Sequence, residues 1–142
     1  MNEEFIFGSQ KSNVLYADRQ AAYVVITDNG KFAAVKAQEK CFLPGGGSLP
    51  GETSEDTVVR EVFEELARKV RLVSKIGAVI QYFYSAADDE YYKMLATFFV
   101  GEFSDEPCGN GKGENELCWL SKAEAEQAFF HECHVWATRQ IE

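Results

Sequence analysis

Three glutamates in the middle of the chain, Glu61, Glu64 and Glu65, constrain the fold more than any other feature of the sequence. On a helix, which turns by about 100° per residue, the three carboxylates share one sector of about 100°. The opposite side of the same helix is apolar and consists of Val59, Val62, Phe63, Leu66 and Val70. Like charges three or four residues apart destabilise a helix, so something must offset the repulsion. Hard oxygen ligands on one rigid face suit a hard divalent cation such as Mg²⁺.

The acidic helix follows a glycine-rich stretch at a fixed distance. Five residues separate Gly46 from Glu52, and seven separate Glu52 from Arg60, which directly precedes the first of the three glutamates. The run of glycines at 45–47 lets the backbone turn sharply and approach a ligand closely. A surface helix whose acids simply face solvent would need neither the glycines nor the Glu52–Arg60 spacing. We therefore favour a ligand-binding interpretation over a solvated acidic face.

This spacing resembles the Nudix box, which runs Gly, five residues, Glu, seven residues, then Arg-Glu-apolar-x-Glu-Glu-x-Gly-apolar. The match holds at Gly46, Glu52, Arg60, Glu61, Val62, Glu64 and Glu65. It fails at the last two positions, where Ala67 and Arg68 replace the family's glycine and apolar residue.

The resemblance implies an α/β fold, a mixed β-sheet sandwiched between α-helices, in which the box forms a loop–helix unit. It also implies four metal ligands, which are the carbonyl oxygen of Gly46 and the carboxylates of Glu61, Glu64 and Glu65. Glu52 and Arg60 would form an ion pair that ties the loop to the helix. Glu64 and Glu65 are both open to a second role, as the base that activates water. The implied cofactor is Mg²⁺, with Mn²⁺ as a substitute.

The same resemblance implies a hydrolase of phosphorus-containing acid anhydrides, which cleaves a nucleoside diphosphate linked to another group. The partner is then a small nucleotide-type diphosphate, such as a (deoxy)nucleoside triphosphate or a diadenosine polyphosphate. Bound cations would neutralise the diphosphate oxygens, orient an attacking water and lower its pKa. The alternative is a Nudix-like sensor domain that binds a nucleotide without turnover, which the altered end of the box suggests.

Four further residues are candidates for substrate contacts or for a distal base. Glu114 and Glu116 precede the last predicted strand, where the resemblance implies a carboxylate from a distal loop, although Glu116 is equally open to a solvent-facing position. Tyr84 has the offset from the box that the resemblance links to diadenosine polyphosphates, but packing in an aromatic strand pair is the favoured interpretation. Because alanine has a high helix propensity, we expect the helix to continue through Ala67. The helix would then reach at least Arg68 and place it beside the carboxylates.

The rest of the sequence predicts a single domain spanning residues 1–142. Alternating and apolar runs predict strands at about 21–27, 32–37, 41–43, 71–85, 91–103 and 116–120. Helices are expected from residue 53 or 54 to about 67, and from about 121 to 142. The second helix is expected to begin at a capping box formed by Ser121 and Glu124.

Bulk properties exclude several classes of function. A net charge of −9 argues against nucleic-acid binding, which needs a basic face. The same charge would repel a polyphosphate unless divalent cations bridge the two. The apolar stretches are too short for a transmembrane span, so no membrane partner is expected. The acidic first residues differ from a signal peptide and favour a cytoplasmic protein. A homodimer is an oligomeric state that the sequence leaves open.

Overall fold

The protein was analysed as a computed structural model, which describes residues 5–105 and 113–141. Two β-sheets lie at its centre. The five-stranded sheet has the strand order β1-β7-β8-β2-β6, and the four-stranded sheet contains β3, β4, β5 and β9. The strands are β1 (Ile6–Phe7), β2 (Ala17–Val25), β3 (Thr27–Asp28), β4 (Lys31–Ala37), β5 (Lys40–Phe42), β6 (Gly45–Gly47), β7 (Val70–Ser85), β8 (Glu90–Phe103) and β9 (Glu116–Leu120).

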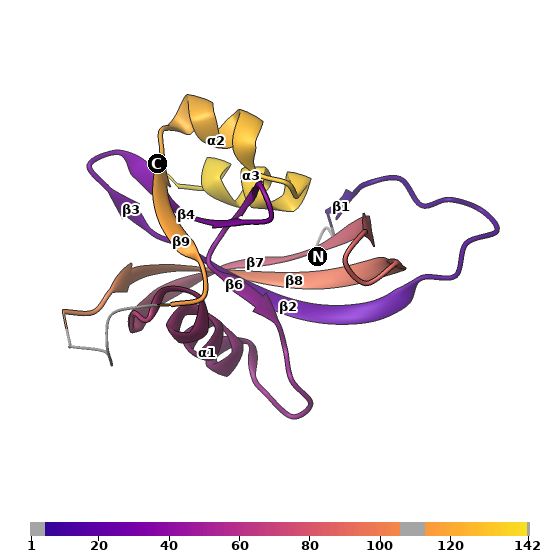
Figure 1. Ribbon diagram of the computed structural model, residues 1–142, viewed down its shortest axis with the longest axis horizontal. Helices are drawn as coiled ribbons and strands as arrows, with labels where there is room; N and C mark the ends of the chain where they lie inside the picture. Colours follow the sequence, from indigo (N-terminus) through magenta and orange to yellow (C-terminus); the bar gives the residue numbers. More distant parts are fainter. Residues whose placement is uncertain (1–4, 106–112, 142) are drawn as a thin grey trace.

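Helices cover both sides of the strands (Figure 1). Helix α1 (Ser54–Leu66) lies on one side, and α2 (Lys122–Ala128) and α3 (Glu132–Arg139) lie on the other. Successive residues of β2 point to opposite faces, so Ala22 and Val24 join the core under α1 while Tyr23 joins the core under α2 and α3. The predicted α/β class, a mixed sheet between helices, is confirmed. In the described part of the chain, no helix has the length and hydrophobicity needed to cross a membrane.

The five-stranded sheet is mixed because strands from distant parts of the chain pair in both directions. β2 runs parallel to β8, and β1 runs parallel to β7, whereas β7 and β8 form a long antiparallel hairpin. The glycine run was expected to be a loop, but it forms β6, an antiparallel partner of β2 at the edge of the sheet. This edge position places the acidic helix directly beside the sheet.

Helix α1 begins where the sequence predicts. The side chain of Thr53 accepts a hydrogen bond from the backbone N–H of Asp56 at 3.1 Å, which satisfies one of the free donors of the first turn. The buried side is made of Thr57, Val58, Val62 and Leu66. Val59 and Phe63, which the periodicity places on the apolar side, are 44% and 46% exposed because they flank this buried stripe.

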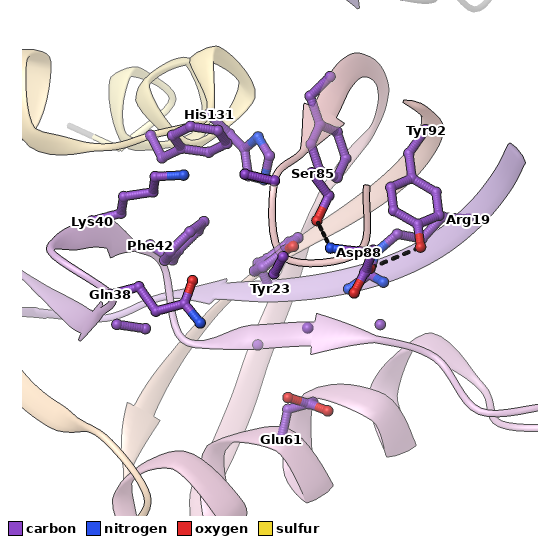
Figure 2. Close-up of a pocket in the computed structure, with 18 of the residues that line it drawn as sticks. Arg19, Tyr23, Gln38, Lys40, Phe42, Glu61, Ser85, Asp88, Tyr92 and His131 are labelled. Carbon is purple, nitrogen blue, oxygen red and sulfur yellow. Dashed lines mark hydrogen bonds between the residues drawn. The ribbon is translucent and has the colours of Figure 1, made fainter. Parts of the chain in front are cut away.

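The C-terminal helical segment is two helices rather than one. The capping box at Ser121 is present, with Ser121 and Glu124 bonded reciprocally. The helix then breaks after Ala128, because the chain returns to β5. The backbone N–H of Phe130 donates to the carbonyl of Cys41 at 2.9 Å. The break places His131 at the start of α3, with its ring toward the space above β6 (Figure 2).

The predicted continuation of α1 to Arg68 is wrong. The helix ends at Leu66, and Ala67 adopts the left-handed conformation with φ 52° and ψ 38°. The backbone N–H groups of Glu114 and Asn115 donate to the carbonyls of Glu64 and Glu65 at 3.0 and 2.9 Å. Those two carbonyls would otherwise bond to the next turn of the helix, so the approaching chain replaces that turn.

Arg68 therefore does not lie beside the acidic face. Its guanidinium carbon is 4.1 Å from the centre of the Phe103 ring, over which it stacks. Among the described residues, no ion pair joins Arg68 to Glu64 or Glu65. The departure from the family pattern at position 68 is thus a packing substitution.

The left-handed end of α1 generates a stability prediction. Ala67→Gly should raise the free energy of unfolding by about 1 kcal/mol, because glycine adopts this conformation without the steric cost that a Cβ carries. The melting temperature should rise by about 3 °C. Ala123→Gly, in the helical and exposed first turn of α2, is the matched control and should destabilise the protein. An equal loss of stability in both variants would contradict the observed backbone at residue 67.

Candidate functional site

A cavity of about 320 Å³ lies above β6 and is enclosed by elements from most of the chain (Figure 2). β6 forms its floor, and the turn of the β7–β8 hairpin, with Ser85 and Asp88, forms one side. Lys40 and Phe42 from the β4–β5 region, together with His131, form the other side. Two acids of α1, Glu61 and Glu65, also line the cavity.

Glycines in β6 allow the helix carboxylates to come this close. Gly45 has a φ of +139°, which side chains rarely adopt, and its backbone N–H donates to Glu65 Oε1 at 3.0 Å. A Cβ atom on Gly46 would lie only 2.5 Å from Glu61 Oε2. Any other residue at 46 would therefore push Glu61 away. The glycines of the sequence motif serve close packing of strand against helix as well as chain flexibility.

Arg60 makes five hydrogen bonds, of which three join the helix to the segment that precedes it. Its Nε and Nη2 atoms donate to the two carboxylate oxygens of Glu52 at 2.6 and 3.0 Å, and Nη2 also donates to the Gly47 carbonyl at 2.9 Å. Its Nη1 atom donates to Glu61 at 2.8 Å and to Glu64 at 3.1 Å. The predicted Glu52–Arg60 ion pair is confirmed, and the same guanidinium also orients the acidic face.

The acids of the site differ in their protonation. Burial raises the pKa of Glu65 to about 8, with a further increase from the neighbouring charges of Glu61, Glu64 and Glu114. Burial also raises the pKa of Glu61, although the Arg60 guanidinium opposes this effect. By contrast, hydrogen bonds from Arg60 lower the pKa of Glu52 to about 2. Burial thus disfavours the ionised forms of Glu61 and Glu65, and a cation bound at this point would stabilise their negative charge.

The donors at this point fit a hard divalent cation, since they are carboxylate and carbonyl oxygens around a glycine strand. In the described residues, however, these donors do not converge on one point as a set of metal ligands. In residues 5–105 and 113–141, no group of three or more His, Cys, Asp or Glu side chains is close enough to hold an ion. Glu64 explains this: its side chain is 44% exposed, bonds to Arg60 and does not line the cavity.

The two distal candidates have different environments. The backbone of Glu114 is bonded to the end of α1, and its charge contributes to the raised pKa of Glu65, so the structure brings it toward the acidic face. Glu116 is an exposed residue of β9 opposite Lys36 and does not line the cavity. The solvent-facing interpretation of Glu116 is the one the structure supports.

Tyr84 lies at the rim of the cavity, at the end of β7. Its hydroxyl donates to Asp89 at 2.6 Å, and its ring packs on Tyr91 with the centroids 4.9 Å apart. The tyrosine is therefore part of the aromatic strand pair, as the packing interpretation predicts, and it borders the space available to a ligand.

Several cavity residues carry no sequence signal. Arg19 on β2, Lys40 after the β4 turn, Tyr92 on β8 and His131 at the start of α3 all line the cavity. They come from four elements that are distant in sequence, and no fixed spacing relates them.

The Arg60 network predicts a loss of stability on its removal. Arg60→Met should lower the free energy of unfolding by about 2 kcal/mol, because Glu52 and Glu61 lose charge-assisted hydrogen bonds in a partly buried position. Urea denaturation measures the change. Arg139→Met removes an exposed ion pair with Glu126 and is the charge-matched control, with an expected loss of less than about 1 kcal/mol. Equal losses in the two variants would show that the network is only a surface feature.

We expect the buried ring of His131 to make the folded protein less stable at acidic pH. Burial lowers its pKa to about 4, aided by the positive charges of Arg19 and Lys40. Since the unfolded histidine has a pKa near 6.5, the stability contributed by the neutral ring is complete above about pH 6.5. It is lost as the pH falls toward 4, and at pH 4.5 the loss is on the order of 2 kcal/mol. His131→Gln should lose less stability between pH 7.5 and 4.5 than the wild type does. An unchanged pH dependence would refute this assignment.

Comparisons with known proteins agree with this geometry. A family model described as NUDIX domain matches residues 17–138. The MutT protein from Methanosarcina mazei Go1 is 21% identical, with a TM-score of 0.67 over 90% of this chain and 96% of that chain. The MutT NUDIX hydrolase from Burkholderia pseudomallei is 24% identical, with a TM-score of 0.65 over 89% of this chain and 99% of that chain. The NUDIX hydrolase from Nitrosomonas europaea is 19% identical, with a TM-score of 0.64 over 87% of this chain and 88% of that chain. A comparison with curated proteins gives no match.

Proposed function

The chain belongs to the Nudix hydrolase family, whose members act on pyrophosphate-containing substrates, and we propose that it cleaves a nucleoside diphosphate linked to another group. The observation that carries the proposal is the pair of acidic side chains, Glu61 and Glu65, that lines the cavity beside the glycines of β6. Members of the family generally need a divalent metal, and the oxygen donors of this chain suit Mg²⁺, with Mn²⁺ as a substitute.

In this proposal Glu65 and Glu61 would hold the metal. Glu64, whose carboxylate bonds to Arg60 and is 44% exposed, would be the third carboxylate ligand. The Gly46 carbonyl supplies a further oxygen. Gly46 is paired with Ala22 in the sheet, and a carbonyl oxygen has two lone pairs, so one remains for a cation. Glu52 and Arg60 position these groups and do not touch the substrate.

When bound, the metal supplies charge for the diphosphate oxygens and a water of lowered pKa. The chain's own contribution is to orient the substrate and to accept a proton. Glu65 is suited to the latter, because it lines the cavity and the backbone N–H of Gly45 fixes its position. Glu114 is the second candidate for the base, since it approaches the same face from the segment before β9.

The sensor alternative is less well supported. The sensor alternative was suggested by the altered end of the box. Ala67 nevertheless adopts the left-handed conformation that a glycine would take there. The substitution therefore leaves the backbone at the end of the acidic helix in a geometry suited to glycine. All three box carboxylates are also present. We propose turnover of a small nucleotide-type substrate, and nucleoside triphosphates and diadenosine polyphosphates are the first compounds to test.

The decisive experiment is a turnover assay on a panel of nucleotides with and without Mg²⁺. Glu65→Gln should lower kcat at least about 100-fold, because the change removes both the charge that binds the metal and the proton acceptor. Glu55→Gln, in the exposed first turn of α1, is the matched control and should leave kcat unchanged. Equal turnover in wild type and Glu65→Gln would eliminate the assigned site.

A separate readout reports on the metal alone. Mg²⁺ should raise the melting temperature of the wild type by mass action, and the shift should vanish in the variant with Glu61, Glu64 and Glu65 all changed to Gln. A Mg²⁺ shift together with nucleotide binding and no turnover would support the sensor alternative.

A further inference from the structure

Three consecutive residues at the start of the glycine strand bond to three different elements. The backbone N–H of Leu43 donates to Nδ1 of His134 on α3 at 3.1 Å, and the carbonyl of Pro44 accepts a hydrogen bond from β2 at 2.9 Å. The backbone N–H of Gly45 donates to Glu65 on α1 at 3.0 Å. Because α1 and α3 lie on opposite sides of the strands (Figure 1), these three residues connect the C-terminal helix with the acidic helix.

The ring of His134 is held in one orientation by its aromatic neighbours. The residue is fully buried. Its ring lies edge-on to three others, with centroids 4.2 Å from that of Tyr23 and 5.9 Å from those of Phe98 and Phe129. A close-packed core leaves such a ring little freedom to turn. Nδ1 is therefore a fixed acceptor for the Leu43 N–H.

The hydrogen bond from Leu43 also determines which ring nitrogen carries the proton. Nδ1 accepts, so the proton of the neutral ring is on Nε2. Burial, with a smaller effect from His131, holds the pKa of His134 well below its ordinary value, so the ring stays neutral. Nε2 is buried and has no partner among the described residues. The ring thus satisfies one buried donor and leaves another unsatisfied, so the main effect of the bond is on geometry and not on net stability.

The segment between the histidine and the acidic face is short and restricted. The Leu43 side chain is fully buried, and the ring of Pro44 fixes φ at that residue. Gly45 has a φ of +139°, and a Cβ atom there would lie 2.2 Å from the Ala22 carbonyl oxygen. A displacement of the Leu43 backbone is therefore passed on to the Gly45 N–H, since a single proline separates the two residues.

We propose, resting on the function above, that His134 is a positioning residue for the reaction. Its bond to Leu43 fixes the Gly45 N–H, and that N–H orients the carboxylate of Glu65. In the described part of the chain, His134 is not among the residues that line the cavity, so it acts through these groups and not on the substrate. The competing explanation is that pairing with β2 alone fixes Gly45 and that His134 is only a core residue.

Two substitutions separate the hydrogen bond from the packing. His134→Asn keeps an acceptor, because the amide oxygen of asparagine is as many bonds from the backbone as Nδ1 is. His134→Leu keeps an apolar group and has no acceptor. If His134→Leu does not fold, His134→Gln, whose acceptor is displaced by one bond, takes its place with the same expected results. Thr138→Ala is the matched control, since Thr138 is buried on the same helix and its hydroxyl donates to the Val135 carbonyl at 2.7 Å.

Amide hydrogen exchange followed by NMR tests the link without substrate or metal. In His134→Leu, the amides of Leu43 and Gly45 should both exchange about 10-fold faster than in the wild type, and His134→Asn should restore most of the protection. The amide of Ala33, which donates to the Ile26 carbonyl at 2.9 Å, reports global unfolding and supplies the correction. Faster exchange at Leu43 with unchanged exchange at Gly45 would overturn the inference.

Turnover provides the second arm. With Mg²⁺ and a nucleotide that the wild type cleaves, His134→Leu should lower kcat at least about 10-fold and change KM by less than about twofold. The effect falls on kcat because Glu65 acts at the reacting centre and not on the organic part of the substrate. His134→Asn should recover most of the loss, and Thr138→Ala should keep the kcat of the wild type. A purely structural role would lower the melting temperature of His134→Leu and leave kcat unchanged, which would also overturn the inference.

The two arms separate this inference from the proposed function. Exchange that rises together at Leu43 and Gly45, with no turnover of any nucleotide by the wild type, would support the link and refute the hydrolase assignment. Turnover with an unchanged kcat in folded His134→Leu would support the hydrolase and refute the positioning role.

Discussion

The structure of the site depends on one guanidinium. Arg60 is attached to a helix, yet two of its partners, Glu52 and the Gly47 carbonyl, belong to the segment that precedes the helix. Without it, this segment and the helix would be linked by packing, by the hydrogen bond from Gly45 to Glu65 and by the hydroxyl contacts of Thr57 with Ser48 and Glu52. The pKa values of the acids around the site follow from this arrangement. Arg60 lowers the pKa of Glu52, whereas Glu65 has no bond to Arg60 among the described residues and its pKa is raised by burial, so a cation would be needed to stabilise its charge.

Sequence reasoning identified the parts of the site that are local in the chain. The box fixes Gly46, Glu52 and Arg60 by spacing, and a helix then brings its acids to one face without any tertiary information. The strand–helix order followed in the same way, because periodicity and turn residues are local signals. The ion pair of Glu52 with Arg60 is also short in range, which is why a resemblance over one segment could predict it.

The remaining features were inaccessible for a physical reason: they depend on which segments meet in space. Alanine propensity favoured a longer helix, but the N–H groups of Glu114 and Asn115 bond to its last carbonyls and end it at Leu66. Tertiary contacts override a propensity of a few tenths of a kcal/mol per residue. The glycine run became a strand because β2 offers it a partner. Arg19 entered the cavity for the same reason, through the position of β2.

The bonds that end α1 have a consequence for how the site can change. They are made by main-chain N–H groups of residues 114 and 115, and every residue except proline supplies the same donor. The side chains at these two positions are therefore not needed to shape the helix. A carboxylate, an amide or an apolar group can stand at 114 while the helix and its acids stay where they are. The scaffold thus holds the end of the helix through the main chain alone, so a single substitution at 114 can change the group presented beside the acids without refolding.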